Sequence, residues 1–210
     1  MSALIRALSP GPGNRTDSLR SGSAVRVKEN AAESEANLKE LASDLGDLFS
    51  KSTLTDAVVY AEGQPIHTHK ALLAARSPVF QSLFERLARE NRPNVILIND
   101  LTFEVVQELI SFMYSGKVNM VSLELLSAAE RYDIKGLKRI CSTSIIKKLS
   151  VSTAIETLIT AHVNKCTELE AAAVKFVSNN WKNVRRENSF THLQNWPHIL
   201  IKIIDTLAKV

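Results

Sequence analysis

Strand-like sequence is confined to one short part of this chain, residues 55–98, and this limits the folds open to it. Thr55–Tyr60 is β-branched and apolar, residues 61–63 form a turn, and Gln64–Thr68 returns as a partner strand, which predicts a hairpin. Val95–Ile98 predicts a third strand. Three short strands cannot close a barrel, so we expect them to pack against helices in an α+β fold.

Helical spacing and capping residues surround these strands. Residues 69–76 carry apolar side chains at helical density, and Ser77 followed by Pro78 is a typical helix start. Thr102 predicts the cap of a further helix, which Gly116 ends. The sequence therefore predicts helices both between the strands and directly after them.

Beyond Gly116 the spacing is helical throughout. The predicted helices are residues 123–132, 134–149, 150–162 and 167–177 and a last amphipathic piece after Pro197. We therefore expect an all-α region to follow the α+β part.

The N-terminal residues differ from the rest in composition. Residues 1–36 are rich in Ser, Gly, Pro, Arg and Glu, and they predict a disordered tail because they offer little apolar area to offset the entropy of ordering. Leu38, Leu41, Leu45 and Leu48 then recur at three and four residues, which predicts an amphipathic helix that ends near residue 50.

Charge and cysteine content exclude several classes of protein. The 26 Lys and Arg against 22 Asp and Glu give a net charge of +4 without a long single-sign block, which does not favour nucleic acid as a partner. The apolar runs are shorter than the roughly 20 residues that span a bilayer. Cys141 and Cys166 form no C-x-x-C pair, which favours the reducing cytoplasm or nucleus over a disulfide framework.

No pattern of residues indicates catalysis. The chain has no G-x-S-x-G elbow, no Gly-rich phosphate loop and no H-E-x-x-H motif. His67 with His69, and His162 with Cys166, could each form half of a metal site, but the further ligands are missing. We expect no enzyme activity, no cofactor and no metal.

Five segments together resemble the BTB/POZ domain of speckle-type POZ proteins. They are residues 41–49, Thr55-Asp56, the string His-Lys-Ala-Leu-Leu-Ala-Ala-Arg-Ser-Pro-Val-Phe at 69–80, residues 98–100 and the run Phe-Met-Tyr-Ser-Gly at 112–116. The resemblance implies a disordered tail at 1–36, a BTB/POZ domain at 37–148 and a cullin-box and BACK-like helical region at 149–210. It also implies a substrate-binding MATH domain, for which residues 1–36 are too short and too polar, so we expect it to be missing.

A homodimer interface is the first implication for function. The family's dimer face matches Leu41, Leu45, Leu48 and Leu72, and all four are apolar. The alternative is that these leucines cover only the core of their own chain. A second self-association surface of the family has a Tyr at the position of Ile204.

Binding to cullin-3 is the second implication. The family uses a large apolar residue, any residue and then Glu, and this pattern falls on Ala88, Arg89 and Glu90. Ala88 offers only a methyl group, and Leu87 could supply bulk from one position away. Tyr114 matches another cullin contact, with a core tyrosine as the alternative.

Three polar residues that match family positions, Asp56, His69 and Arg76, are expected to be structural. The resemblance thus predicts a BTB adaptor that dimerises, binds cullin-3 and brings protein substrates to a ubiquitin-protein ligase. The alternative is a scaffold or regulator that heterodimerises with full-length relatives and binds cullin weakly. A transcriptional co-repressor platform is a third possibility, and it lacks a zinc-finger pattern in this sequence.

Overall fold

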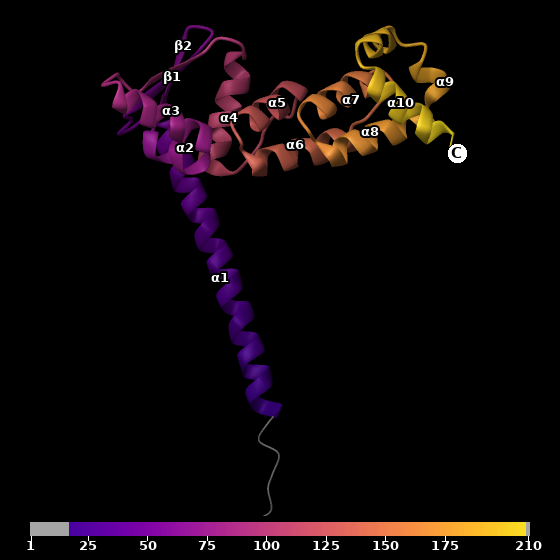
Figure 1. Cartoon of the computed structure of the whole chain (residues 1–210). Coiled ribbons are helices and arrows are strands. Elements are labelled where there is room, and N and C mark those ends of the chain that lie inside the picture. Colours follow the sequence, from indigo (N-terminus) through magenta and orange to yellow (C-terminus); the bar gives the residue numbers. More distant parts are fainter. Residues whose placement is uncertain (1–16, 209–210) are drawn as a thin grey trace, which may run out of the picture. The chain divides into compact units, whose positions relative to one another are not determined.

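The computed structural model describes the backbone of residues 17–208 and the side chains of residues 31–208 (Figure 1). The chain forms two units, Met1–Ser43 and Asp44–Val210. Within the described residues, no helix is both long enough and apolar enough to cross a membrane.

Helix α1 (Asp17–Ser50) has 34 residues and passes from the first unit into the second. It begins at Asp17, well before the helix start predicted near Leu38. The disordered tail predicted for residues 1–36 stays a prediction, and residues 1–16 lie outside the described residues. Residues 17–36 hold no proline, and their four Ala and three Glu favour a helix even where the apolar area is small. An ion pair of 2.7 Å between Lys39 and Glu35, one turn apart, adds local support.

The second unit contains a three-stranded sheet in the order β2-β1-β3. Strands β1 (Ala57–Ala61) and β2 (Gln64–Thr68) form the predicted hairpin, with Val59 opposite Ile66, and β3 (Val95–Ile98) pairs with β1 in parallel. Glu62 and Gly63 at the hairpin turn have φ values of 48° and 75°, a conformation that suits a tight two-residue turn. A parallel pair needs a crossover, and two helices supply it.

These crossover helices are α2 (Lys70–Arg76) and α3 (Pro78–Arg89). Ser77 starts α3 as predicted, because its Oγ accepts a hydrogen bond of 3.2 Å from the Phe80 backbone N–H, and Pro78 takes the first helical position. The same Oγ donates a hydrogen bond of 2.6 Å to the Tyr132 carbonyl oxygen. Ser77 therefore ties the start of α3 to a segment 55 residues further along the chain.

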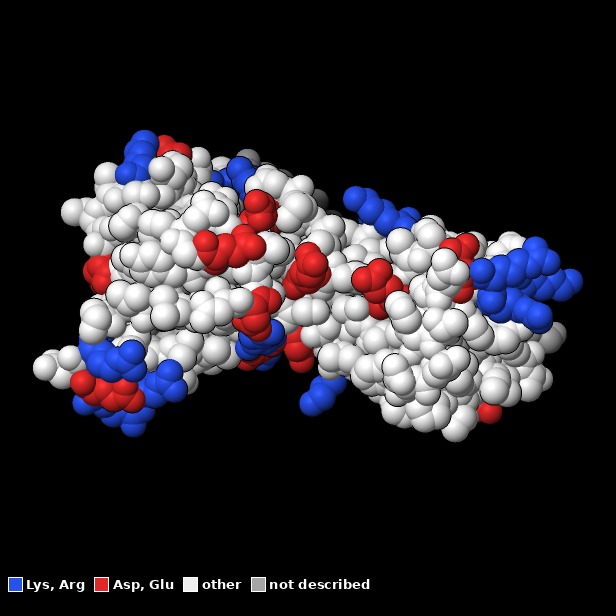
Figure 2. Space-filling model, turned by 90° about the horizontal axis from the view of Figure 1, so that it is seen from above, with Lys and Arg blue, Asp and Glu red and all other residues white. Residues whose placement is uncertain are grey.

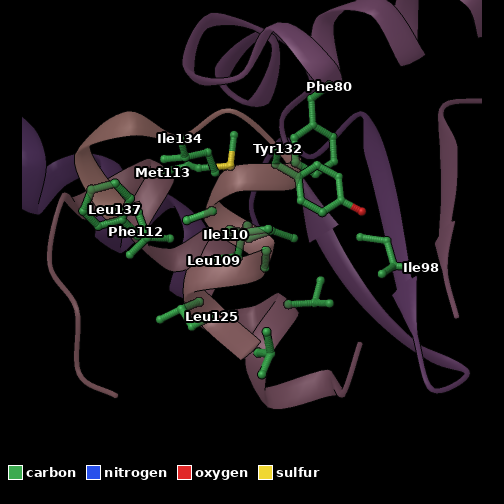
Figure 3. Close-up of a cluster of buried hydrophobic side chains, with 14 of the residues drawn as sticks. Phe80, Ile98, Leu109, Ile110, Phe112, Met113, Leu125, Tyr132, Ile134 and Leu137 are labelled. Atoms are coloured by element: carbon green, nitrogen blue, oxygen red, sulfur yellow. The ribbon is translucent and has the colours of Figure 1, made fainter. Parts of the chain in front are cut away.

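Helix α4 (Phe103–Ser115) lies in the middle of the main core. Thr102 caps it through a hydrogen bond from the Val105 N–H, and Gly116 ends it in the left-handed region at φ 67°, both as predicted. Figure 3 shows side chains from α4 packed with those from the sheet and the neighbouring helices, and Phe80 stacks on Tyr132 with ring centroids 4.8 Å apart. This core therefore joins elements that are far apart in the sequence.

The remaining elements are helical, as predicted. They are α5 (Leu123–Arg131), α6 (Lys135–Lys147), α7 (Ala154–Val163), α8 (Thr167–Asn179), α9 (Trp181–Val184), the 3-10 helix η1 (Asn188–Asn195) and α10 (Pro197–Leu207). Helices α9 and η1 have no counterpart among the helices that the sequence predicts. A second hydrophobic cluster extends from Ala154 to Ile203, while Ala161, Cys166 and Leu169 belong to the main core. Helices α7 and α8 thus pack into both clusters.

Candidate protein-interaction surfaces

The residues predicted for self-association are only partly covered by their own chain. Leu45 and Leu48 on α1 and Leu72 on α2 are half-buried, and Leu45 and Leu72 also pack against the main core. Leu41, in the first unit, is 54% exposed. The chain's own core therefore buries these leucines only in part, and the part that stays exposed is available to a second copy.

The C-terminal end of α1 packs against α4. The Phe49 and Tyr114 rings stack with centroids 4.8 Å apart, and a Cβ atom at Gly46 would lie 3.7 Å from the Cβ of Ser115. Such a separation is ordinary van der Waals contact. Leu45 and Leu48 therefore sit on a helix segment whose position is fixed by contacts with α4.

Tyr114, predicted as a cullin contact, is 3% exposed in this chain. Its hydroxyl oxygen accepts a hydrogen bond of 2.8 Å from the His69 backbone N–H and lies 2.8 Å from His69 Nδ1. Burial raises the pKa of Tyr114 to about 12 despite the hydrogen bond from the His69 backbone. These contacts favour the alternative of a core tyrosine, and a contact with cullin stays a prediction.

The His69 ring completes this network. Its Nε2 lies 2.8 Å from the Thr53 carbonyl oxygen, which can only accept a hydrogen bond. In the tautomer that satisfies all three contacts, Nε2 carries the proton and Nδ1 accepts from the Tyr114 hydroxyl. Both ring nitrogens of His69 therefore have partners inside the chain, whereas His67, the other histidine of this pair, is exposed.

Asp56 and Arg76 also have contacts that stabilise the fold. The Asp56 carboxylate accepts a hydrogen bond of 2.7 Å from the Lys70 backbone N–H at the start of α2, a helix that has no side-chain cap from His69. The Arg76 guanidinium lies 5.8 Å from the centre of the Phe112 ring, within range of a cation–π interaction.

The segment predicted to bind cullin-3 is at the end of α3. Ala88 is exposed, and Glu90, the exposed C-cap residue, forms an ion pair of 3.2 Å with Arg92. Leu87 is only 5% exposed because it packs in the main core, so the structure corrects the idea that it supplies the missing bulk. The structure thus leaves Ala88 and Glu90 as the accessible parts of the motif.

A groove of about 440 Å³ lies beside Ala88, between α2 and α3. It is lined by Lys70, Ala74, Ala75, Gln81, Phe84, Glu85 and Ala88. Phe84 is 1% exposed and supplies an apolar wall, while the small side chains of Ala74 and Ala75 leave the space open. This groove was not predicted from the sequence. The adjacent small residues Ala74 and Ala75 are the feature of the sequence that could have indicated it.

The C-terminal helices leave a second apolar surface. Ile201 and Ile204 on α10 are 58% and 57% exposed, whereas Ile199 and Ile203 are buried in the second cluster. Ile204 is therefore placed where it is accessible to a partner, as the resemblance implies for that position.

The half-buried carboxylate of Glu170 on α8 links this helix to α7 and α10. Glu170 Oε1 accepts hydrogen bonds from Lys202 Nζ at 2.5 Å and His162 Nδ1 at 3.1 Å. Burial tends to raise the pKa of Glu170, but these two partners outweigh it and lower the pKa. His162 is thus hydrogen-bonded to Glu170. Among the described residues, no three or more His, Cys, Asp or Glu side chains lie together as a group that could hold a metal ion.

Charged side chains do not form a single-sign face in the view of Figure 2. Uncharged surface covers much of this face, with acidic side chains near its middle and basic ones toward its ends. A contact with another protein fits such a surface better than a contact with a polyanion.

One family model and one solved structure are similar to parts of this chain. The family model for the BTB/POZ domain matches residues 45–149. A solved structure of the BTB domain of zebrafish PATZ1 is 22% identical, with a TM-score of 0.47, over 55% of this chain and 95% of that chain.

Two curated mouse proteins are similar over most of this chain. TD and POZ domain-containing proteins 2 and 3 of Mus musculus are each 34% identical over 174 residues, which cover 80% of this chain and 48% of each relative. The chain thus spans about half the length of the curated relatives it matches. Their names refer to TD and POZ domains, so the finer likeness to speckle-type proteins stays a prediction.

Proposed function

The chain belongs to the BTB/POZ domain family, and from this we propose that it is a self-associating, non-catalytic adaptor that links protein substrates to a cullin-3 ubiquitin-protein ligase. BTB domains generally dimerise and bind other proteins. The observation that carries the cullin contact is the exposure of Ala88, which lines the groove between α2 and α3, and of Glu90 at the end of α3. We place the protein in the cytoplasm or nucleus, where its two buried free thiols would remain reduced.

Self-association is supported by Leu45, Leu48 and Leu72. Each is partly covered within its own chain, so a second copy would complete the burial of all three. A fully buried leucine contributes about 1.5–3 kcal/mol, from which the cost of association is subtracted. A two-fold axis brings the same surface of both copies together, which suits a self-complementary apolar patch.

The cullin contact is supported by the chemistry at the end of α3. A partner side chain could enter the groove against Phe84, while Glu90 offers an exposed carboxylate at the end of α3. The ion pair between Glu90 and Arg92 is exposed, and such pairs contribute only about 0–1 kcal/mol, so exchanging it for a partner contact costs little.

A scaffold or regulator that pairs with full-length BTB relatives and binds cullin weakly is the second candidate. The observation in its favour is that Ala88 presents a methyl group and that Leu87, buried in the core, cannot replace the larger side chain. In this function, the main activity would be dimerisation through the surface of Leu45, Leu48 and Leu72.

Two measurements on the unmodified chain separate these functions. Light scattering gives the mass in solution, and calorimetric titration with the N-terminal domain of cullin-3 gives the affinity. A dimer that binds cullin-3 with a micromolar or tighter dissociation constant supports the adaptor. A dimer without measurable binding supports the scaffold, and a monomer contradicts the self-associating adaptor.

A further inference from the structure

Helix α1 carries a stripe of small and apolar residues at heptad spacing, and most of it precedes the matched family domain. Alternating steps of three and four residues place the following residues in one register: Ala24, Val27, Ala31, Ser34, Leu38, Leu41, Leu45 and Leu48. A straight helix drifts about 20° per heptad from such a strict repeat. A repeat kept over eight positions therefore indicates a helix that supercoils with another helix.

The part of the stripe in the first unit is exposed. All of residues 31–41 are exposed, and Leu38 and Leu41 reach 65% and 54%. A helix draws most of its stability from packing an apolar stripe rather than from intrinsic propensity. Two neighbouring leucines left in water on a helix of 34 residues therefore indicate a missing partner.

The charges beside the stripe favour a second copy of α1 over an oppositely charged helix. In a parallel pair, the residue just before an a position faces the residue five further along the partner. Asn37 then faces Ala42, and Glu35 faces position 30, which is asparagine in the sequence, so no like charges meet. Lys39, Glu33 and Glu40 occupy positions away from the stripe, and Lys39 pairs with Glu35 within the helix.

We propose that α1 pairs with α1 of a second copy as a parallel, in-register, two-stranded coiled coil over residues 24–41. The coil is continuous with Leu45 and Leu48, and this proposal rests on the self-association proposed above. Ala and Ser at several core positions bury little area, so the coil does not hold two chains together alone. Dimerisation of the folded domain supplies an effective concentration of about a millimolar, and the coil then closes as an intramolecular step.

Cysteine cross-linking of the full chain tests this pairing. Ser34→Cys places a thiol in the seam, where two copies in register bring their Cα atoms close enough for a disulfide. Glu33→Cys, one residue away, points out of the seam and is the matched control. Under mild oxidation we expect Ser34→Cys to give a covalent dimer of twice 23.2 kDa. It should form at least about tenfold faster than with Glu33→Cys, and the wild type should give the background from the buried Cys141 and Cys166.

The outcomes separate this inference from the proposed function. If the reduced Ser34→Cys protein is dimeric by light scattering but cross-links no faster than Glu33→Cys, the coil is refuted and the self-association stands. The stripe is then covered by its own chain or by a different protein. If the reduced protein is monomeric, both proposals fail. As a second test, Ser34→Leu should raise the melting temperature of the dimer, and an unchanged value also counts against the coil.

Discussion

The Tyr114 hydroxyl lies 2.8 Å from both the backbone nitrogen and Nδ1 of His69, and this contact joins α4 to the start of α2 across 45 residues of sequence. Tyr114→Phe removes the hydroxyl and leaves two polar groups of His69 without a partner. We expect the free energy of unfolding to fall by about 1–3 kcal/mol in denaturant titration. Tyr60→Phe is the matched control, because the half-buried Tyr60 hydroxyl has no hydrogen-bond partner among the described residues.

The same variant separates a structural role of Tyr114 from a direct contact with cullin. If Tyr114 acts only in the core, Tyr114→Phe should lower stability and leave the affinity for cullin-3 unchanged at a temperature where the variant is folded. A loss of affinity without a loss of stability would contradict the core role.

Alkaline pH should destabilise the fold through two buried groups. Burial raises the pKa of Tyr114 from 10.0 to about 12 and that of the Cys141 thiol from 9.0 to about 12. The stability that follows from these shifts is complete below the unfolded pKa values and is lost as the pH rises through the folded ones. The free energy of unfolding should therefore decline from about pH 9 upward, by on the order of a few kcal/mol.

Cys141→Ala tests the lower part of this pH range. Without the thiol, the free energy of unfolding should decline less steeply between pH 9 and pH 10, because of Tyr114 and Cys141 only Tyr114 then contributes a raised pKa. An unchanged slope in equilibrium unfolding at pH 8, 9 and 10 would show that Cys141 does not cause it.

Gly46→Ala should stabilise the second unit. The added Cβ atom would lie 3.7 Å from the Ser115 Cβ, which is ordinary contact, and alanine is favoured over glycine within a helix by about 1 kcal/mol. We expect the free energy of unfolding to rise by about 0.5–1 kcal/mol. A decrease would mean that α1 and α4 approach each other more closely than this distance implies.

The double substitution Leu45→Asp with Leu48→Asp should give folded monomers. Two carboxylates in the proposed interface would have to be buried without partners, which costs far more than the leucines contribute. Light scattering reports the mass, and circular dichroism confirms that the variant is folded. The interface lies elsewhere if the folded variant remains a dimer.

Local chemistry made much of the fold predictable. The strands at Gln64–Thr68 and Val95–Ile98 match the structure to the residue, and Ser77, Thr102 and Gly116 act as the caps that their residue types predicted. Each of these features depends on a few neighbouring residues. Sequence patterns can therefore show them without knowledge of the tertiary contacts.

Features set by distant contacts or by weak patterns were missed. The contact between His69 and Tyr114 joins two helices that only the folded chain brings together, and the burial of Leu87 depends on the direction of α3 over the core. The early start of α1 was hidden because Ala31 and Ser34 keep the heptad spacing without a hydrophobic signal. Composition alone therefore did not predict that this helix begins at Asp17.

Calorimetric titration of the cullin-3 N-terminal domain into wild type, Ala88→Met and Glu90→Ala tests the adaptor function most directly. A larger apolar side chain at position 88 would fill a pocket on cullin-3 that the methyl group of Ala88 leaves partly empty and contribute about 1–2 kcal/mol, so Ala88→Met should tighten binding roughly tenfold. Glu90→Ala should weaken binding because an exposed carboxylate that could accept hydrogen bonds from cullin-3 is lost.

Glu156→Ala, which removes an exposed carboxylate on α7, serves as the matched control and should bind as the wild type does. The mass of every variant should remain that of the wild type. If Ala88→Met leaves the dissociation constant unchanged and Glu90→Ala has no effect, the end of α3 is not the cullin site, and the scaffold function becomes the better account.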